Sequence, residues 1–93
     1  MVIGVMTLEF HLPSCQSLKS KRYIVKSLKD RLFNKFNVSV AEIEYQDLWQ
    51  RTKIAVVTVS GNRRFANSVL SKVMDLARRE KEAVLTNTET YFV

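Results

Sequence analysis

The chain has 93 residues, 46% hydrophobic and 26% charged, with a formal net charge of +6. This composition is typical of a folded globular domain and excludes a disordered or collagen-like chain. Cys15 is the only cysteine, so the chain has neither an intramolecular disulfide nor the thiolates of a usual zinc site. We therefore expect one domain over residues 1–93, without metal or cofactor, in a reducing compartment that we take to be the cytoplasm.

The first segment, Val2 to Leu12, alternates between apolar and polar residues with the period of a half-buried strand. Its apolar part is too short to span a membrane, and we expect no membrane association. Pro13 ends the strand, and Ser17 is the predicted N-cap of a helix that runs to Phe36. The helix is expected to bury the residues that recur at helical spacing, namely Leu18, Val25, Leu28, Leu32 and Phe36.

Two further strands, Val38 to Tyr45 and Thr52 to Ser60, are predicted to form a hairpin around the loop at residues 46–51. A symmetric loop places Glu44 opposite Lys53 and Ile43 opposite Ile54. In this reading one sheet face carries charged residues together with a row of small apolar ones, which are Val38, Val40, Ala55, Val57 and Val59. Such a patch predicts self-association through the open sheet face or an edge strand, although scattered exposed valines on a monomer are the plain alternative.

Gly61 and Asn62 interrupt the third strand and precede a second helix that frays near Lys81. Its predicted buried stripe is Phe65, Val69, Leu70, Val73, Leu76 and Ala77. Val84 to Val93 is the last strand, expected at a sheet edge. The order of elements predicts an α+β, ferredoxin-like βαββαβ domain, a four-stranded antiparallel sheet with two helices on one face and the third strand between the first two. The turn at Pro13, the start of the first helix and the loop at 46–51 then lie at one end.

The net positive charge lies in one segment, Leu18 to Phe36, where seven basic residues accompany a single acidic one, Asp30. Lys19, Arg22, Lys26 and Lys29 follow one another at helical spacing as a basic stripe, with Tyr23 and Phe33 beside it. Such a stripe suits a phosphate backbone. Its alternative is a solvated helix face.

Basic residues also crowd the first turn of this helix, where the helix dipole disfavours cations and a bound anion relieves the repulsion. The residues concerned are Lys19, Lys21 and Arg22. The neighbouring loop carries Asp47, Trp49 and Arg51, a contact set for RNA, an anion or a protein. For Trp49 the alternative is a cap over the hydrophobic core.

Catalysis finds little support in the sequence. His11 is the only histidine and Cys15 the only cysteine, and no neighbouring residue is evident that activates such a pair. The chain also lacks a glycine-rich phosphate loop. We expect no enzymatic activity and no small-molecule substrate.

Four runs of sequence resemble the YlxP-like family of small bacterial proteins of unknown function: Ser17 to Arg22, Ser27 to Leu32, Phe36 to Glu42 and Gln46 to Arg51. The resemblance covers practically the whole chain. It implies a ferredoxin-like fold in a bacterial cytoplasmic protein, with genes often near those for translation initiation and ribosome assembly. It supplies no catalytic residues, and leaves Lys19, Lys21, Arg22, Asp47, Trp49 and Arg51 as contact candidates.

Two functions lead at this point, and a small-molecule binder or enzyme with an anion site near Lys21 and Arg51 ranks below both. The first is a non-catalytic accessory protein that binds structured RNA or the ribosome through its basic helix and the Trp49 loop. The second is a homo-oligomeric interaction module whose basic helix binds an acidic protein.

Overall fold

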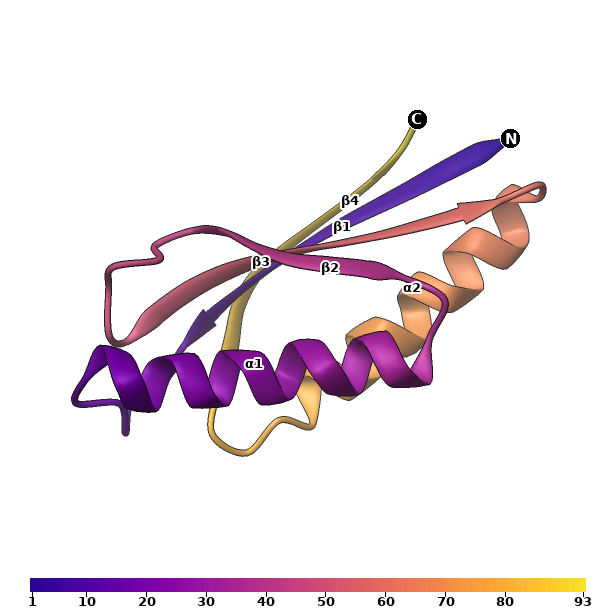
Figure 1. Ribbon diagram of the computed structural model, residues 1–93. Helices are drawn as coiled ribbons and strands as arrows, with labels where there is room; N and C mark the ends of the chain where they lie inside the picture. The colour runs from indigo at the N-terminus through magenta and orange to yellow at the C-terminus, as the bar shows by residue number, and fades with distance from the viewer.

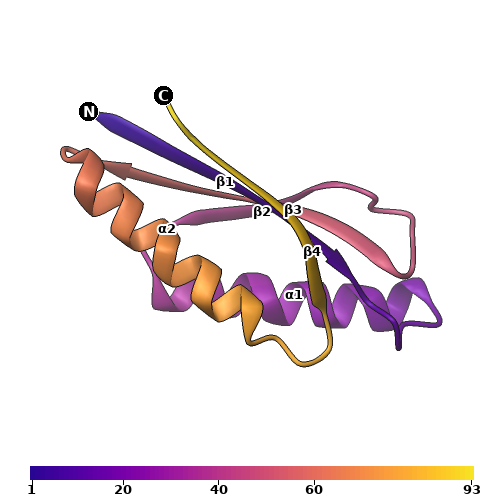
Figure 2. The same ribbon diagram turned by 180° about the vertical axis from the view of Figure 1, so that it is seen from behind.

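The structure is a computed structural model that describes residues 1–93. The chain forms β1 (Val2–His11), α1 (Leu18–Lys35), β2 (Ser39–Glu44), β3 (Arg51–Ser60), α2 (Arg63–Arg78) and β4 (Val84–Phe92). The strands make one sheet of order β2-β3-β1-β4 with antiparallel neighbours (Figures 1 and 2). The predicted place of the third strand between the first two, and of the last strand at an edge, is confirmed.

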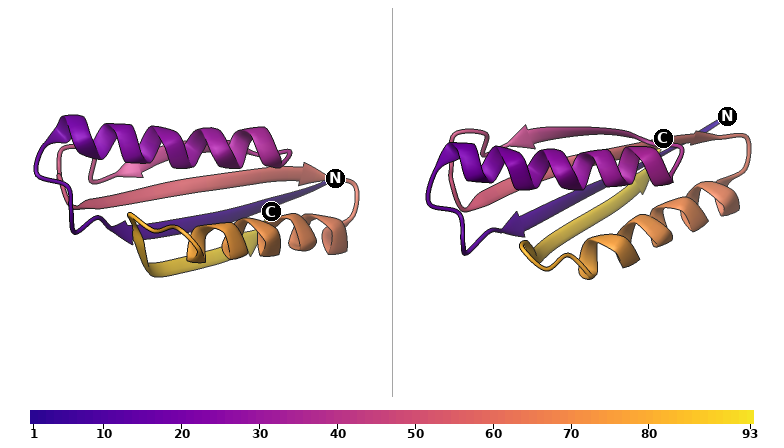
Figure 3. Two further views of the ribbon diagram at one scale, coloured as in Figure 1. Left: turned by 90° about the horizontal axis from the view of Figure 1, so that it is seen from below. Right: turned by 60° about the horizontal axis from the view of Figure 1, so that its bottom comes forward.

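Both helices lie on the same face of the sheet, as Figure 3 shows from two directions. Helix α1 runs along the β2 side, while α2 covers β1 and the neighbouring strands. Between the helices and the sheet lies one cluster of 16 buried residues, which includes Leu8, Phe10, Leu28, Ile54 and Val73. The opposite face of the sheet has no covering layer. Neither helix combines the length and the apolar character that a membrane crossing requires.

Both predicted helix starts are correct. The hydroxyl oxygen of Ser17 accepts a hydrogen bond from the Ser20 amide at 3.1 Å, and the side-chain oxygen of Asn62 accepts one from the Phe65 amide at 3.1 Å. Each bond satisfies an amide that has no partner within its own helix. Phe65, however, is 63% exposed, so its prediction as a core residue is wrong. Ala66, which follows it, is fully buried instead.

The hairpin departs from the predicted register because β2 contains an irregularity. Glu44 does lie opposite Lys53, as predicted, but Ile54 lies opposite Glu42 and not Ile43. Ile43 is the extra residue of a β-bulge, and it is 42% exposed. The register predicted from a symmetric loop could not include this extra residue, since a bulge adds one residue to one strand only.

The bulge also changes which side chains share a sheet face. Val40 lies opposite Val56, whose side chain is fully buried beneath the helices, and Val38 is buried as well. The predicted patch of five residues on the open face is therefore wrong for Val38 and Val40. Ala55, Val57 and Val59 do lie on the uncovered face, because they alternate with the buried residues of β3.

Candidate nucleic-acid interface

The outward face of α1 carries the basic stripe predicted from the sequence. Lys19, Arg22 and Lys26 are exposed, and Lys29 is half-buried on the flank. Tyr23 and Phe33 lie on the same outward face and are 77% and 65% exposed. They are large aromatic side chains that the protein's own core does not use. The face thus combines cations with aromatic rings, both of which contact nucleic acids.

Most of these cations have no acidic partner. Among the four residues of the stripe only Lys26 forms an ion pair, at 2.8 Å with Asp30 one turn along the helix. The hydrogen bond to Asp30, more than its charge, raises the pKa of Lys26 above its ordinary value. Arg31, on the flank towards α2, pairs with Glu80. Lys19, Arg22 and Lys29 therefore present uncompensated positive charge.

Lys21 does not belong to this face, and its prediction as a contact residue is wrong. Its side chain is fully buried. Its ammonium group donates to the carbonyl oxygens of Tyr45 at 2.7 Å and Gln46 at 3.2 Å, and lies 2.8 Å from a carboxylate oxygen of Glu42. The hydroxyl of Thr52 donates to the same carboxylate oxygen at 2.6 Å. A buried ammonium with three oxygen partners serves the fold and cannot meet a ligand.

The helical spacing of the sequence indicates that Lys21 is buried. Lys21 precedes Val25, Leu28 and Leu32 by four, three and four residues in succession, which places it on the buried stripe of α1. Its basic character led to its assignment to the charged face instead. Glu42, its partner, is turned towards the helices by the register of β2.

The loop between β2 and β3 is tied to the start of α1, so these segments lie at one end of the molecule as predicted. Lys21 of α1 makes one connection, through the carbonyl oxygens of Tyr45 and Gln46. Gln50 makes another, because its side-chain amide donates to the carbonyl oxygens of Cys15 at 3.1 Å and Pro13 at 3.3 Å. The Leu12 amide donates to the Gln50 carbonyl oxygen at 2.9 Å. No sequence pattern indicates this role for Gln50, because its side-chain amide binds backbone carbonyl groups, which every residue carries.

The tip of this loop is open to solvent. Trp49 is 52% exposed and Leu48 is 47% exposed, so the alternative in which they cap the core does not hold. Asp47 is exposed and forms no hydrogen bond or ion pair. Together these residues line an open hollow of about 610 Å³, whose complete lining is His11, Asp47, Leu48, Trp49, Gln50 and Arg51.

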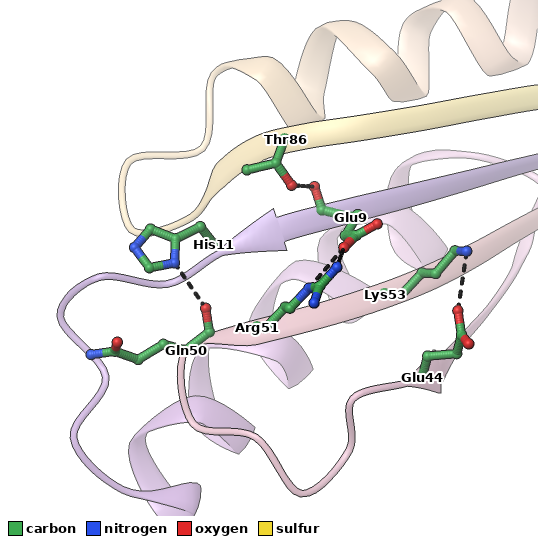
Figure 4. A network of polar contacts seen from close by, with 7 residues as sticks. All are labelled: Glu9, His11, Glu44, Gln50, Arg51, Lys53 and Thr86. Carbon is green, nitrogen blue, oxygen red and sulfur yellow. Dashed lines mark hydrogen bonds and ion pairs between the residues drawn. The ribbon is translucent and has the colours of Figure 1, made fainter.

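Arg51 belongs to a different surface from the basic stripe. It lies on the uncovered sheet face, where its guanidinium donates to Glu9 through Nε at 2.8 Å and also through a second nitrogen (Figure 4). It also lies over the ring of Tyr45, 4.0 Å from the centroid. The hydrogen bond to Glu9 raises the pKa of Arg51. Lys53 makes a similar pair with Glu44 at 3.1 Å, which raises the pKa of Lys53.

The predicted site is thus divided. Lys19, Arg22, Lys26 and Lys29 form one helical face, and Asp47 and Trp49 form a loop tip beside the start of that helix. Arg51 reaches the hollow from the opposite side of the sheet. A second hollow, of about 540 Å³, adjoins the stripe at the start of α1 and includes Lys19, Tyr23 and Glu82 in its lining.

The two residues considered for a catalytic pair make other contacts. Cys15 is buried, and Nδ1 of His11 lies 3.1 Å from the Gln50 carbonyl oxygen.

Comparison with known proteins agrees with this architecture. The fold resembles that of a de novo designed protein with a ferredoxin fold, solved by NMR, with a TM-score of 0.50 and 13% identity over 97% of this chain and 84% of that one. The α+β, ferredoxin-like class predicted from the sequence is confirmed.

Residues 3–90 match the family described as "Protein of unknown function (DUF503)", and the chain belongs to this family. It is 38% identical over 92 residues to the uncharacterized protein YlxP of Bacillus subtilis (strain 168), covering 97% of this chain and all of that protein. The family resemblance seen in the sequence motifs is therefore confirmed.

Proposed function

We propose that this protein is a non-catalytic, cytoplasmic accessory protein that binds structured RNA through the outward face of α1. The observation that carries the proposal is the composition of that face. Lys19, Arg22 and Lys29 have no acidic partner, and Tyr23 and Phe33 are exposed beside them. An ordinary solvent-exposed helix face carries charges of both signs, and large aromatic side chains are usually buried in the core instead.

The dimensions of the stripe suit a backbone contact. The first and last cations, Lys19 and Lys29, lie ten residues apart, so at a rise of 1.5 Å per residue the stripe is about 15 Å long. This length meets several phosphates of a duplex or folded strand. Contacts of this kind fix position without reading bases, so we expect preference for folded RNA over any particular sequence.

The test compares two fourfold charge reversals. One changes Lys19, Arg22, Lys26 and Lys29 to Glu, and the matched control changes Arg64, Lys72, Arg78 and Arg79 to Glu on or beside α2. Each takes the formal net charge from +6 to −2, since every reversal removes two charges. Binding to structured ribosomal RNA fragments is measured by fluorescence anisotropy across a salt series, with polyglutamate as competitor.

We expect the α1 variant to lose RNA binding by at least a hundredfold while the α2 variant retains most of it. For the unchanged protein, log K should fall against log salt with a slope of about −3, as four phosphate contacts imply. Equal losses in both variants contradict the assignment to α1. If polyglutamate displaces the labelled RNA as effectively as unlabelled RNA does, the result points instead to an acidic protein partner for this face.

A further inference from the structure

The two edges of the sheet differ in how open they are to another strand. β2 has six residues, contains the bulge at Ile43 and lies beside the basic helix α1. β4 has nine residues and carries neither Lys, Arg nor Pro between Val84 and Phe92. Natural edge strands usually hold lysine, proline or a local bulge that discourages pairing with another chain. The pairing of β4 with β1 shifts register at Thr86, between Leu85 and Asn87, but it is regular from Asn87 to Phe92, and this longer stretch lacks such protection.

The hydrogen-bond alternation shows which groups of β4 face outward. The amides of Ile3 and Val93 each donate to the other's carbonyl oxygen, at 3.1 and 2.8 Å. In an antiparallel pair such exchanging residues alternate with non-exchanging ones. Counting back along the register, Tyr91, Glu89 and Asn87 bond to β1. The backbone groups of Thr88, Thr90 and Phe92 therefore point to the open edge.

Thr88 has a second distinction. Its hydroxyl oxygen is the one buried side-chain polar atom of the chain without a hydrogen-bond partner. Buried hydroxyls almost always have a partner, and an unsatisfied one calls for an explanation. In its present rotamer no group of the chain donates to or accepts from this hydroxyl.

We propose that two copies of this chain pair through β4, antiparallel about a twofold axis at Thr88, to form a continuous eight-stranded sheet. On that axis each Thr88 lies opposite the same residue of the second copy. Their outward backbone groups then exchange hydrogen bonds, and rotation about χ1 brings the two hydroxyls into contact, a pair that recurs between neighbouring strands. The unpartnered hydroxyl thereby acquires its partner.

The charges on β4 select this register over its neighbours. With Thr88 on the axis, Asn87 lies opposite Glu89 of the second copy, so each carboxylate meets an amide. Moving the axis by one residue to Glu89 places this carboxylate opposite itself and creates repulsion, while moving it to Asn87 removes the pairing of each carboxylate with an amide. Pairing through β2 is disfavoured separately, because it brings two α1 helices together, each with seven basic residues and one acidic residue.

The inference is independent of RNA binding, and its test uses sedimentation equilibrium of the purified protein at tens of micromolar. We expect a dimer. Thr90→Pro removes an outward amide without removing a bond to β1, a change that edge strands tolerate, and should give a monomer. Asn87→Glu sets Glu opposite Glu twice per dimer and should raise the dissociation constant by roughly tenfold. Asn87→Lys sets Lys opposite Glu and should lower it.

Ala41→Glu is the matched control, because it adds the same charge to the same sheet face on the opposite edge strand. It should leave the dimer intact. A monomer in the unchanged protein, or dissociation by Ala41→Glu with no effect of Asn87→Glu, overturns the proposal. If Thr90→Pro fails to give cooperative unfolding, the two Asn87 variants decide the question, because their side chains lie on the uncovered face.

Discussion

Three oxygen atoms hold the ammonium group of Lys21, and they connect α1 to β2 and to the following loop. Replacing Lys21 by Met leaves the Glu42 carboxylate, whose side chain is only 16% exposed, without its cation. Breaking one half of a buried pair costs about 3 kcal/mol or more. We therefore expect Lys21→Met to lower the free energy of unfolding in urea by about this amount.

Lys19→Met is the control for this variant, since Lys19 lies two residues away and its side chain is exposed and unpaired. Its stability should change by less than about 0.5 kcal/mol. Similar stabilities for the two variants would show that the buried contacts of Lys21 add nothing over a hydrophobic side chain.

Trp49 has a different character, because half of its surface is exposed at the loop tip. Trp49→Ala should change the free energy of unfolding by less than about 1 kcal/mol. If the ring stacks on a base, the same change should weaken RNA binding by about 1–3 kcal/mol. Thermal unfolding and anisotropy titration check the two values. A large loss of stability would return Trp49 to the hydrophobic core.

The packing of α2 on the sheet depends on a close approach at Gly4 in β1. A β-carbon at this position would lie 3.0 Å from Leu70 Cδ1 and 3.3 Å from Phe92 Cε1. The three carbons of a valine side chain cannot be accommodated there unless the neighbouring side chains move. We expect Gly4→Val to destabilise the protein by about 1–3 kcal/mol, measured by urea unfolding.

Gly61 provides the comparison, because a β-carbon there meets nothing within 4 Å. Gly61→Val should therefore leave the stability nearly unchanged. If Gly4→Val is equally harmless, the helix and sheet adjust more readily than a close-packed interior normally does.

Sequence patterns were sufficient to predict the helices, and those strands whose side chains alternate regularly between the two sheet faces. The caps at Ser17 and Asn62 followed from local chemistry, the strand order from the order of the elements, and the Glu44–Lys53 pair from the loop length. The faces of β2 did not, because one extra residue at Ile43 reverses the alternation on one side of it. Nothing in the composition of that strand distinguishes a regular ladder from a bulged one.

The site was harder to predict than the fold for a related reason. Charge alone placed Lys21 with its basic neighbours, whereas its position relative to Leu28 and Leu32 places it inside. Arg51 was grouped with Asp47 and Trp49 because it ends the loop that neighbours the start of α1. The alternation of β3 sends it to the other side of the sheet, against Glu9.

The two proposed surfaces lie at different parts of the molecule. Helix α1 accompanies β2, at one side of the sheet, while β4 is the strand at the other side (Figure 3). Pairing through β4 therefore leaves the outward face of α1 free in both copies. A dimer would present two such faces to one RNA, and a linked pair of contacts binds more tightly than either alone.

The burial of Lys21 also makes the protein its own reference for chemical labelling. Amine-reactive reagents modify exposed lysines, and Lys21 is the only buried lysine of the chain. In the folded protein its modification should be slow with or without RNA, whereas protection of Lys19 and Lys26 should depend on RNA. Mass spectrometry of the same sample would thus report both the bound surface and, through any reaction at Lys21, the fraction of molecules in which the loop has opened.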